Sequence, residues 1–392
     1  MKVVIKEDII KELKRIGLEK NDVVMVHTSL KNMGYVCGGA QTIIEALLEV
    51  VGEEGTIMMP TQSWRNLDPE DGVHWEADKN DWQLIRDNLP AYDKNITPTN
   101  TMGAVAEMFR QWPGSIRSDH PARSVCALGK YAHYLTKDHD LSNIFGDGSP
   151  IARLYELDGK VLLLGVGYDK NTSVHLADAR AQYPGKHDCT EYSAIMENGK
   201  RVWKKYDTLF VDGEDFEEIG SAFEEEHPVS KGTIGKADIR LMKQRDIVDY
   251  AVKWIEKNRK NLSPTEIVVK FFEDGYTNHN YDYIMSCMAE NYIDHSPAGA
   301  RSNVDAVGIL KIVAEQFSNL TVKVLDVFAE GGMVATRILY DGIHTGTCMG
   351  IPATGKHITF EALENFKVEN GKITESWGYW PDKEIEQKLK AD

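Results

Sequence analysis

The sequence has few cysteines, no long apolar run and no excess of basic residues. Its five cysteines among 392 residues are scattered and form no CxxC pair, which excludes a disulfide framework and a zinc ribbon. No stretch approaches the roughly 20 consecutive apolar residues that cross a bilayer, so a membrane-spanning chain is excluded. With 45 Lys and Arg against 61 Asp and Glu, the formal charge is −16. No nucleic-acid partner is therefore expected, because phosphate neutralisation requires clustered basic residues.

The excess of acidic residues has two interpretations. An acidic surface attracts cationic small molecules, but it also serves simply to keep a protein in solution. The first twenty residues, MKVVIKEDIIKELKRIGLEK, carry charges among their apolar positions, and no small-residue cleavage site follows. This segment is expected to be a helix rather than a signal peptide, and the cytoplasm is the expected location.

The first two thirds of the chain alternate between helical and strand patterns, which is typical of an α/β domain. Helices are predicted at 7–16 and 41–51, and strands at 23–27, 55–60 and 159–165. The last of these strands, GKVLLLG, has an unbroken apolar core and leads into the glycine-bearing turn GVGYDKNTSVH. Strand ends of this kind carry functional groups in α/β folds.

A polar segment, KNRKNLS at 257–263, separates two predicted domains, residues 1–260 and 261–392. Ser263, Pro264 and Glu266 form a helix start with an N-cap and an acidic first turn. Helices are predicted at 264–276, 281–291 and 303–317, followed only by strands at 320–330, 333–346, 357–369 and 372–380. The pair Asn370-Gly371 predicts a tight hairpin. This order describes a compact α+β domain with an antiparallel sheet.

Four separated motifs of the first domain resemble the aminoglycoside 3-N-acetyltransferases, the antibiotic N-acetyltransferase family. They are VVMVHTSLKNMGYVCGGAQTIIEALLEVVGEEGTIMMPT, SDHPARSVCALG, GDGSPIARLYELDGKVLLLGVGYDKNTSVHLADAR and IGKADIRLMKQRDIVDYAVKWI. The resemblance implies an α/β fold with a mixed central sheet. It also implies acetyl-CoA as donor, the 3-amino group of a 2-deoxystreptamine aminoglycoside as acceptor, and no metal. Some relatives acylate other amines, so a non-antibiotic amine is an alternative acceptor.

Amide formation from a thioester and an ammonium requires a base that removes a proton from the acceptor, and a neutral imidazole suits this task. His175 in NTSVHLAD matches the family's general base. The family pairs this base with a carboxylate shortly after a WK dipeptide, which here points to Asp207 behind Trp203-Lys204. Asp212 and Glu214 lie close enough in the sequence to be alternatives. No covalent acyl-enzyme is needed.

The segment GYVCGG places glycines before a helix, where backbone N–H groups can approach a ligand. By itself such a turn has a purely structural explanation. The resemblance implies that these and neighbouring residues line a coenzyme A tunnel: Ser29, Leu30, Tyr35, Val36, Gly38, Gly39, Ser124 and Val125.

Contacts to a cationic acceptor are expected from the acidic and aromatic stretch Asp68–Asp93, in particular Trp75, and from Asp178 in HLADAR. His120 matches a family motif and is a further candidate, as is His27, although each can also be an ordinary hydrogen-bonded histidine. No metal is expected, because His187, Asp188 and Cys189 are adjacent and cannot all turn toward one ion.

The second domain resembles the SnoaL-like polyketide cyclase and ketosteroid isomerase-like superfamily. The resemblance rests on FFEDGYTNHNYDYIMSCMAENYIDHSP and ITESWGYWPDKEIEQKL, and it implies a cone with a pocket. His295 and Asp382 match its pocket residues. Many members only bind a ligand or dimerise, so the alternative function is small-molecule binding or cyclase-like chemistry here, and a homodimer is possible.

Overall fold

The computed structural model describes residues 3–71, 73–74, 76–211, 213–259, 262–296 and 299–391. The chain divides into two compact units, residues 1–259 and 260–392.

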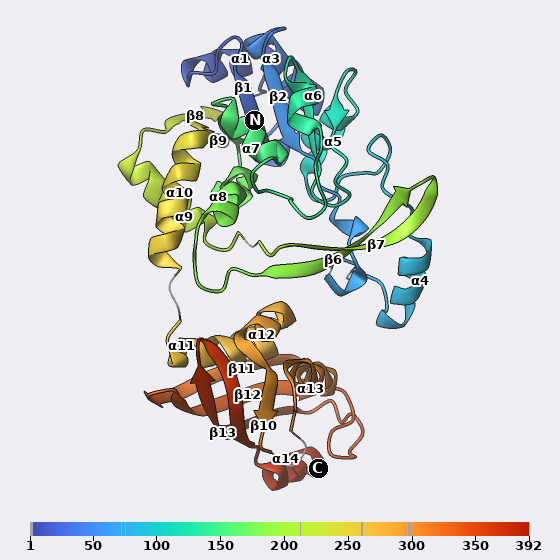
Figure 1. The fold of residues 1–392 in the computed structure, drawn as a ribbon, viewed down its shortest axis with the longest axis vertical. Helices are drawn as coiled ribbons and strands as arrows, with labels where there is room; N and C mark the ends of the chain where they lie inside the picture. Colours follow the sequence, from blue (N-terminus) through green and yellow to red (C-terminus); the bar gives the residue numbers. More distant parts are fainter. Residues whose placement is uncertain are drawn as a thin grey trace. The chain divides into compact units, whose positions relative to one another are not determined.

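The first unit is built on a seven-stranded sheet (Figure 1). The central strand β1 (Val23–Thr28) runs parallel to β2 (Thr56–Pro60) on one side and to β5 (Lys160–Leu164) on the other. The outer strands pair antiparallel, so the sheet is mixed, as the resemblance implied. The sheet order is β3-β4-β2-β1-β5-β9-β8. The outer strands are β3 (Ile116–Arg117), β4 (Val125–Gly129), β8 (Ser230–Ile234) and β9 (Ala237–Lys243).

Both faces of this sheet are buried, which explains the unbroken apolar runs in its central strands. Along β1, Val24 and Val26 belong to one apolar core, whereas Val23 and Met25 belong to another. Alternate residues point to opposite faces of a strand, so the two cores lie on opposite sides of the sheet. The first core is covered by α1 (Lys6–Arg15), α3 (Gly39–Val51) and α5 (Gly103–Arg110). The second is covered by α6 (Ala132–Thr136), α7 (Pro150–Glu156), α8 (His175–Arg180), α9 (Phe216–Glu226) and α10 (Gln244–Asn258).

A separate two-stranded ribbon, β6 (Asp188–Glu197) and β7 (Lys200–Leu209), extends from this unit toward α4 (Trp82–Asn88) (Figure 1). The ribbon is attached to the segment that follows β2. Tyr92 donates its backbone N–H to the Ala194 carbonyl at 2.8 Å, and Leu67 forms an isolated bridge with Ser193. The ribbon therefore supports the loop that continues from β2.

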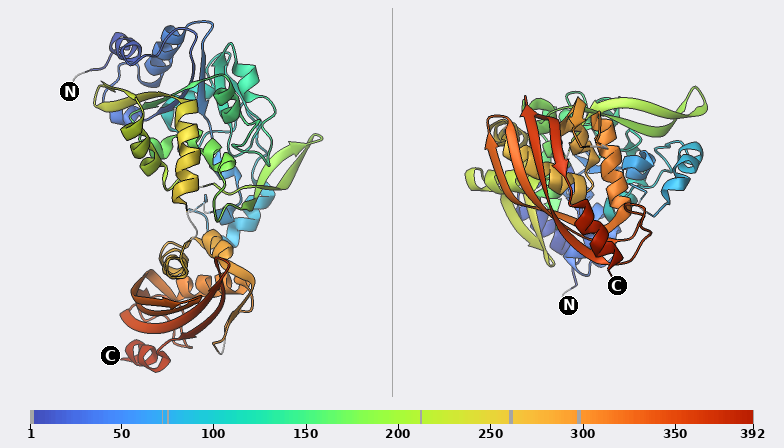
Figure 2. Two further views of the ribbon diagram at one scale, coloured as in Figure 1. Left: turned by 60° about the vertical axis from the view of Figure 1, so that its left-hand side comes forward. Right: turned by 90° about the horizontal axis from the view of Figure 1, so that it is seen from below.

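The second unit is a five-stranded curved sheet with helices packed against one face (Figure 2). Its sheet order is β10-β14-β13-β12-β11. The strands are β10 (Met288–Asp294), β11 (Phe317–Glu330), β12 (Met333–His344), β13 (His357–Glu369) and β14 (Lys372–Tyr379). The helices are α11 (Pro264–Phe272), α12 (Tyr281–Cys287), α13 (Asn303–Gln316) and α14 (Asp382–Lys390). The α+β class is confirmed.

One predicted helix in this unit is wrong in its second half. Residues 288–294, expected to continue the helix that begins at 281, form β10, which pairs parallel with β14. Tyr292 shares a hydrogen bond of 2.6 Å with Ser376 of β14, so pairing with a distant strand overrides the local helical pattern. The sheet is consequently not purely antiparallel. The predicted hairpin is confirmed: Asn370 and Gly371 have φ of 52° and 76°, and Glu369 pairs with Lys372.

Candidate active site

A large cavity opens where the parallel strands of the first unit end. Because β1 and β5 are parallel and Thr28 pairs with Leu164, their carboxyl ends meet at one edge of the sheet, the usual place for a ligand site in such folds. The cavity has a volume of about 1900 Å³, and its lining includes 26–32, 60, 62 and 165–167. A single small-molecule pocket measures about 300–1,000 Å³, so there is room for two substrates at once.

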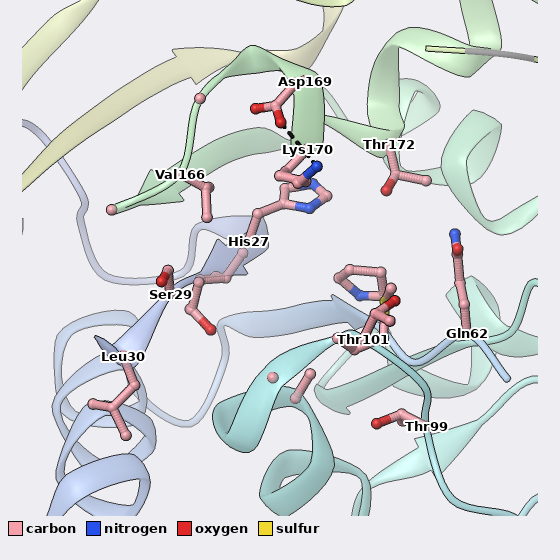
Figure 3. Close-up of a pocket in the computed structure, with 18 of the residues that line it drawn as sticks. His27, Ser29, Leu30, Gln62, Thr99, Thr101, Val166, Asp169, Lys170 and Thr172 are labelled. Carbon is pink, nitrogen blue, oxygen red and sulfur yellow. Dashed lines mark ion pairs between the residues drawn. The ribbon is translucent and has the colours of Figure 1, made fainter. Parts of the chain in front are cut away.

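Two ends of the cavity can be distinguished. In Figure 3, Ser29 and Leu30 lie on one side of the open space, and Gln62 and Thr99 on the other. The first end includes Gly34, whose backbone has φ of 86°. The glycine turn after β5 is tightly packed, because a Cβ on Gly165 would lie 2.9 Å from that of Ala237.

His175 reaches the cavity from the first turn of α8. Its side chain is 16% exposed, and its ring is stacked on Phe145 with 4.6 Å between centroids and 5° between planes. Phe216 packs against it at 4.7 Å. These two aromatic contacts fix the plane of the imidazole, and the remaining orientation depends on its hydrogen bond.

That hydrogen bond is made by Asp178, one helical turn further on. Nδ1 of His175 lies 2.9 Å from Oδ2 of Asp178. The two residues are three positions apart, a separation at which side chains of one helix meet. The other carboxylate oxygen accepts from Nη1 of Arg259 at 2.7 Å, and Arg259 in turn donates two hydrogen bonds to Asp215, at 2.7 and 2.8 Å. The two carboxylates raise the pKa of the Arg259 guanidinium. The Asp178 side chain is fully buried. A buried carboxylate needs a partner of opposite charge, and Arg259 provides it.

Asp207, the carboxylate expected to pair with His175, lies elsewhere. It is an exposed residue of β7 and accepts a hydrogen bond of 2.6 Å from Thr190 on β6. The alternating strand pattern turns it to solvent, whereas Asp178 is held beside His175 by helical geometry. Asp178, expected to contact the acceptor, is not among the described lining residues, and its two oxygens are hydrogen-bonded to His175 and Arg259. Asp212 lies outside the described residues, and Glu214 is not among those that line the cavity.

The residues predicted to bind coenzyme A are only partly brought together. Ser29 and Leu30 line the cavity. Tyr35 is 59% exposed and Val36 is buried beside Val4. Neither of these two appears among the described lining residues, nor do the other four: Gly38 is the N-cap of α3, Gly39 begins it, and Ser124 and Val125 are buried.

Two histidines behave differently. His120 is fully buried, its Nδ1 accepts from the backbone N–H groups of Ala122 and Arg123, and burial holds its pKa well below the usual range. It supports the cavity wall from behind rather than lining it. His27 does line the cavity (Figure 3), and burial lowers its pKa to about 3, so it is neutral. Trp75 lies outside the described residues.

In the second unit, His295 and Asp382 are not brought together. His295 bonds to Glu375 at 2.8 Å and stacks on Trp377, with the side chain 38% exposed. Asp382 is exposed at the start of α14, where a carboxylate stabilises the helix N-terminus.

Another carboxyl of this unit, the half-buried Glu364, lies on the inward face of the sheet. Burial, with the nearby charge of Asp294 as a second cause, raises its pKa to about 8. It pairs across the sheet with Thr336 and Gly378. Glu364 is not among the residues predicted from the sequence, although β13 offers a signal. Alternate positions of this strand are buried, and Glu364 occupies the same face: Ile358, Phe360, Ala362, Phe366 and Val368. A charged residue in an inward register is rarely solvated.

The described part of the chain contains neither a metal-binding cluster nor a membrane-spanning helix. No group of three or more His, Cys, Asp or Glu residues that could hold a metal ion occurs there. No helix there combines the length and apolar character needed to cross a membrane.

Comparison with known proteins agrees with this architecture. Residues 25–256 match the family model described as aminoglycoside 3-N-acetyltransferase, and residues 266–389 match that of the SnoaL-like polyketide cyclases. The SPbeta prophage-derived aminoglycoside N(3')-acetyltransferase-like protein YokD of Bacillus subtilis is 41% identical over 66% of this chain and 94% of its own length. Aminoglycoside N(3)-acetyltransferase VII of Streptomyces paromomycinus is 38% identical over 63% of this chain and 90% of its own.

Solved structures agree as well. The YokD crystal structure, 40% identical, superposes with a TM-score of 0.64 over 66% of this chain and 95% of its own. The structure of AAC-IIIb in binary complex with CoASH, 29% identical, gives 0.59 over 67% of this chain and all of its own. The second unit is SnoaL-like, and through its first unit the chain belongs to the aminoglycoside 3-N-acetyltransferase family of acyltransferases.

Proposed function

We propose that the first unit transfers the acetyl group of acetyl-CoA to the 3-amino group of 2-deoxystreptamine aminoglycosides, with His175 as general base. The observation that carries the proposal is the imidazole at the cavity wall, fixed by Asp178 at 2.9 Å and by Phe145. The names of the relatives supply the acceptor. Such an activity would confer antibiotic resistance.

The chemistry follows from the hydrogen bond at Nδ1. When Nδ1–H donates to the Asp178 carboxylate, Nε2 is left as an acceptor. Nε2 removes a proton from the acceptor ammonium, and the resulting amine attacks the thioester carbonyl. The C–S bond then breaks, the amide forms, and coenzyme A leaves as a thiolate that takes up a proton. The imidazolium formed in the first step is stabilised by Asp178.

Asp178 is thus a positioning residue, and Arg259 with Asp215 holds it in place. Both oxygens of this carboxylate are hydrogen-bonded, one to His175 and the other to Arg259. Asp207 has no such connection to His175, so we assign the orienting role to Asp178.

The cavity wall fits coenzyme A as a substrate. Lys31, Lys236 and Arg240 offer cations for its phosphates, and Gly34 allows the backbone to approach it closely. Ser29 and Leu30 line the same end (Figure 3). The CoASH-bound relative described above supports this assignment.

The test is thiol release from acetyl-CoA with a panel of deoxystreptamine aminoglycosides, comparing the full chain with His175→Gln. Loss of a general base lowers the rate by about 10²–10⁴-fold, while acetyl-CoA binding, measured by calorimetry, should change little. A His175→Gln variant that keeps its rate would refute the role of His175. Absence of turnover in the wild-type chain with all aminoglycosides would refute the acceptor.

A second candidate function belongs to the second unit and is favoured by Glu364. A carboxyl with a pKa near 8 is protonated at neutral pH and can donate a hydrogen bond to a ligand carbonyl. Small-molecule binding or cyclase-like proton transfer in this unit is therefore an alternative. If Glu364→Gln and Asp294→Asn leave the binding of a panel of aromatic ketones unchanged, this candidate loses its support.

A further inference from the structure

We propose that the end of the cavity opposite Leu30 contains a subsite for an oxyanion, centred on Arg123, so that the enzyme also acetylates amines that carry a carboxylate or a phosphate. This inference rests on the transfer chemistry proposed above and concerns the acceptor alone.

Arg123 has a donor with nothing to bind. Its side chain is 10% exposed and lines the cavity, and Nη2 donates to Oε1 of Glu191 at 2.7 Å. Nη1 is buried and has no hydrogen-bond partner among the described residues. An unmade hydrogen bond on a buried charged group is costly, and an oxyanion that displaces the atoms now covering Nη1 would satisfy it.

The guanidinium is held firmly in position. The backbone N–H of Arg123 donates to His120 at 3.0 Å, and Glu191 is itself fixed by the hydroxyl of Tyr206 at 3.0 Å. The ring of Trp64, another residue of the cavity wall, lies 4.7 Å from the guanidinium carbon. A donor fixed in this way recognises a ligand without first having to be ordered.

The wall as a whole is more basic than acidic. Among the described lining residues, the acidic ones are Asp169 and Asp238. The basic ones are Lys31, Arg65, Arg123, Lys170, Lys236 and Arg240. Three carboxylates that pair with these arginines, Glu76, Glu191 and Glu224, do not appear among the described lining residues. The charged side chains on the described wall are therefore mainly basic, and four of the six are paired with a carboxylate.

The subsite is separate from the cations assigned to coenzyme A. Lys236 lies beside Gly34, 3.8 Å from the position of a Cβ on that glycine. Arg123 instead lies against Trp64. Trp64 is two residues after Gln62, and Gln62 lies on the side of the cavity opposite Leu30 in Figure 3. A polyammonium acceptor gains nothing from a guanidinium here, whereas an oxyanion gains a charge-assisted hydrogen bond.

The experiment measures thiol release by the full chain with acceptors that differ in one group. Glucosamine 6-phosphate is compared with glucosamine, glycylglycine with glycylglycinamide, and kanamycin serves as the aminoglycoside reference. In at least one pair, we expect kcat/KM for the acceptor with the anionic group to exceed kcat/KM for the acceptor without it by about 10-fold or more. A hydrogen bond to a charged group contributes a free energy of this size. Which pair responds identifies phosphate or carboxylate.

Arg123→Gln should reduce this preference toward unity, whereas Arg123→Lys should retain part of it. Arg86→Gln is the matched control, since Arg86 also pairs with a carboxylate, Asp68, but is not among the described lining residues; it should leave the preference unchanged. The wild-type comparison requires no variant, so a misfolded Arg123 variant does not remove the test.

Equal rates for both members of each pair, with kanamycin acetylated, would overturn this inference and leave the proposed function intact. No thiol release with any acceptor would overturn the proposed function and the inference with it. A preference that survives Arg123→Gln would show that another residue binds the anion and would also overturn the assignment.

Discussion

Replacing Asp178 by asparagine separates the two carboxylates that compete for the role beside His175. In the native structure one oxygen of Asp178 accepts from Nδ1 of His175 and the other from Arg259, at 2.9 and 2.7 Å. An amide has only one acceptor oxygen. The charged guanidinium is the stronger partner for that oxygen, so the NH₂ group turns to His175 and donates to Nδ1. The ring proton then moves to Nε2, which can no longer accept a proton from the ammonium.

The expected loss in kcat/KM is that of a general base, about 10²–10⁴-fold. Stability should fall less than in most broken buried ion pairs, which cost about 3–5 kcal/mol, because Arg259 keeps both hydrogen bonds to Asp215. We expect a decrease of about 1–3 kcal/mol in the free energy of unfolding. Thiol-release kinetics and urea unfolding measure the two quantities.

Asp207→Asn is the matched control. Asp207 is exposed and accepts a hydrogen bond from Thr190, so the change should alter stability by no more than about 0.5 kcal/mol. Its activity should stay near that of the wild type. The reasoning fails if Asp207→Asn loses activity as severely as Asp178→Asn, or if Asp178→Asn stays within about 10-fold of the wild type.

Two further predictions concern stability. The folded-state pKa of Glu364, about 8, lies above its ordinary value of 4.5, so the folded chain holds this proton more tightly and loses stability as pH rises between these values, by at most about 1.4 kcal/mol per pH unit. Glu364→Gln should therefore match the wild type near about pH 4.5 and be the more stable protein near about pH 8.5 in urea unfolding; a pH-independent difference would contradict this. Gly220→Ala should destabilise the first unit by about 1–3 kcal/mol or more, because its Cβ would lie 1.9 Å from the ring of buried Tyr168. The control Gly308→Ala, in an exposed position of α13 with nothing within 4 Å, should instead raise the melting temperature; equal effects of the two would be inconsistent with the packing.

Most of the regular structure was predictable because it depends on local patterns. The apolar run before Gly165 and the pair Asn370-Gly371 each specify their structure within a few residues. The exception, residues 288–294, forms a strand because β14 lies beside it, about eighty residues further along the chain.

Of the candidate site, the general base His175 was predictable from the sequence, but the carboxylate that orients it was not. His175 lies in the motif NTSVHLAD, and its separation of three residues from Asp178 already places the two on one helix face. The pairing with Asp207 relied on a register after Trp203 that the sequence does not define. Glu364 was missed because an inward carboxyl is visible only once the buried positions of β13 are known.

The sequence by itself determined the two-domain order, the strand–turn–helix that carries His175, and the family to which the first unit belongs, since all of these reside in contiguous residues. The tertiary structure decided which carboxylate orients the imidazole, because the contact that fixes Asp178 comes from Arg259, 81 positions away. It also determined that one guanidinium nitrogen of Arg123 bonds to Glu191, 68 positions away, while the other has no partner among the described residues. Burial and pairing depend on how strands and helices assemble. Contacts between residues so far apart along the chain leave no pattern in the local sequence from which they could be predicted.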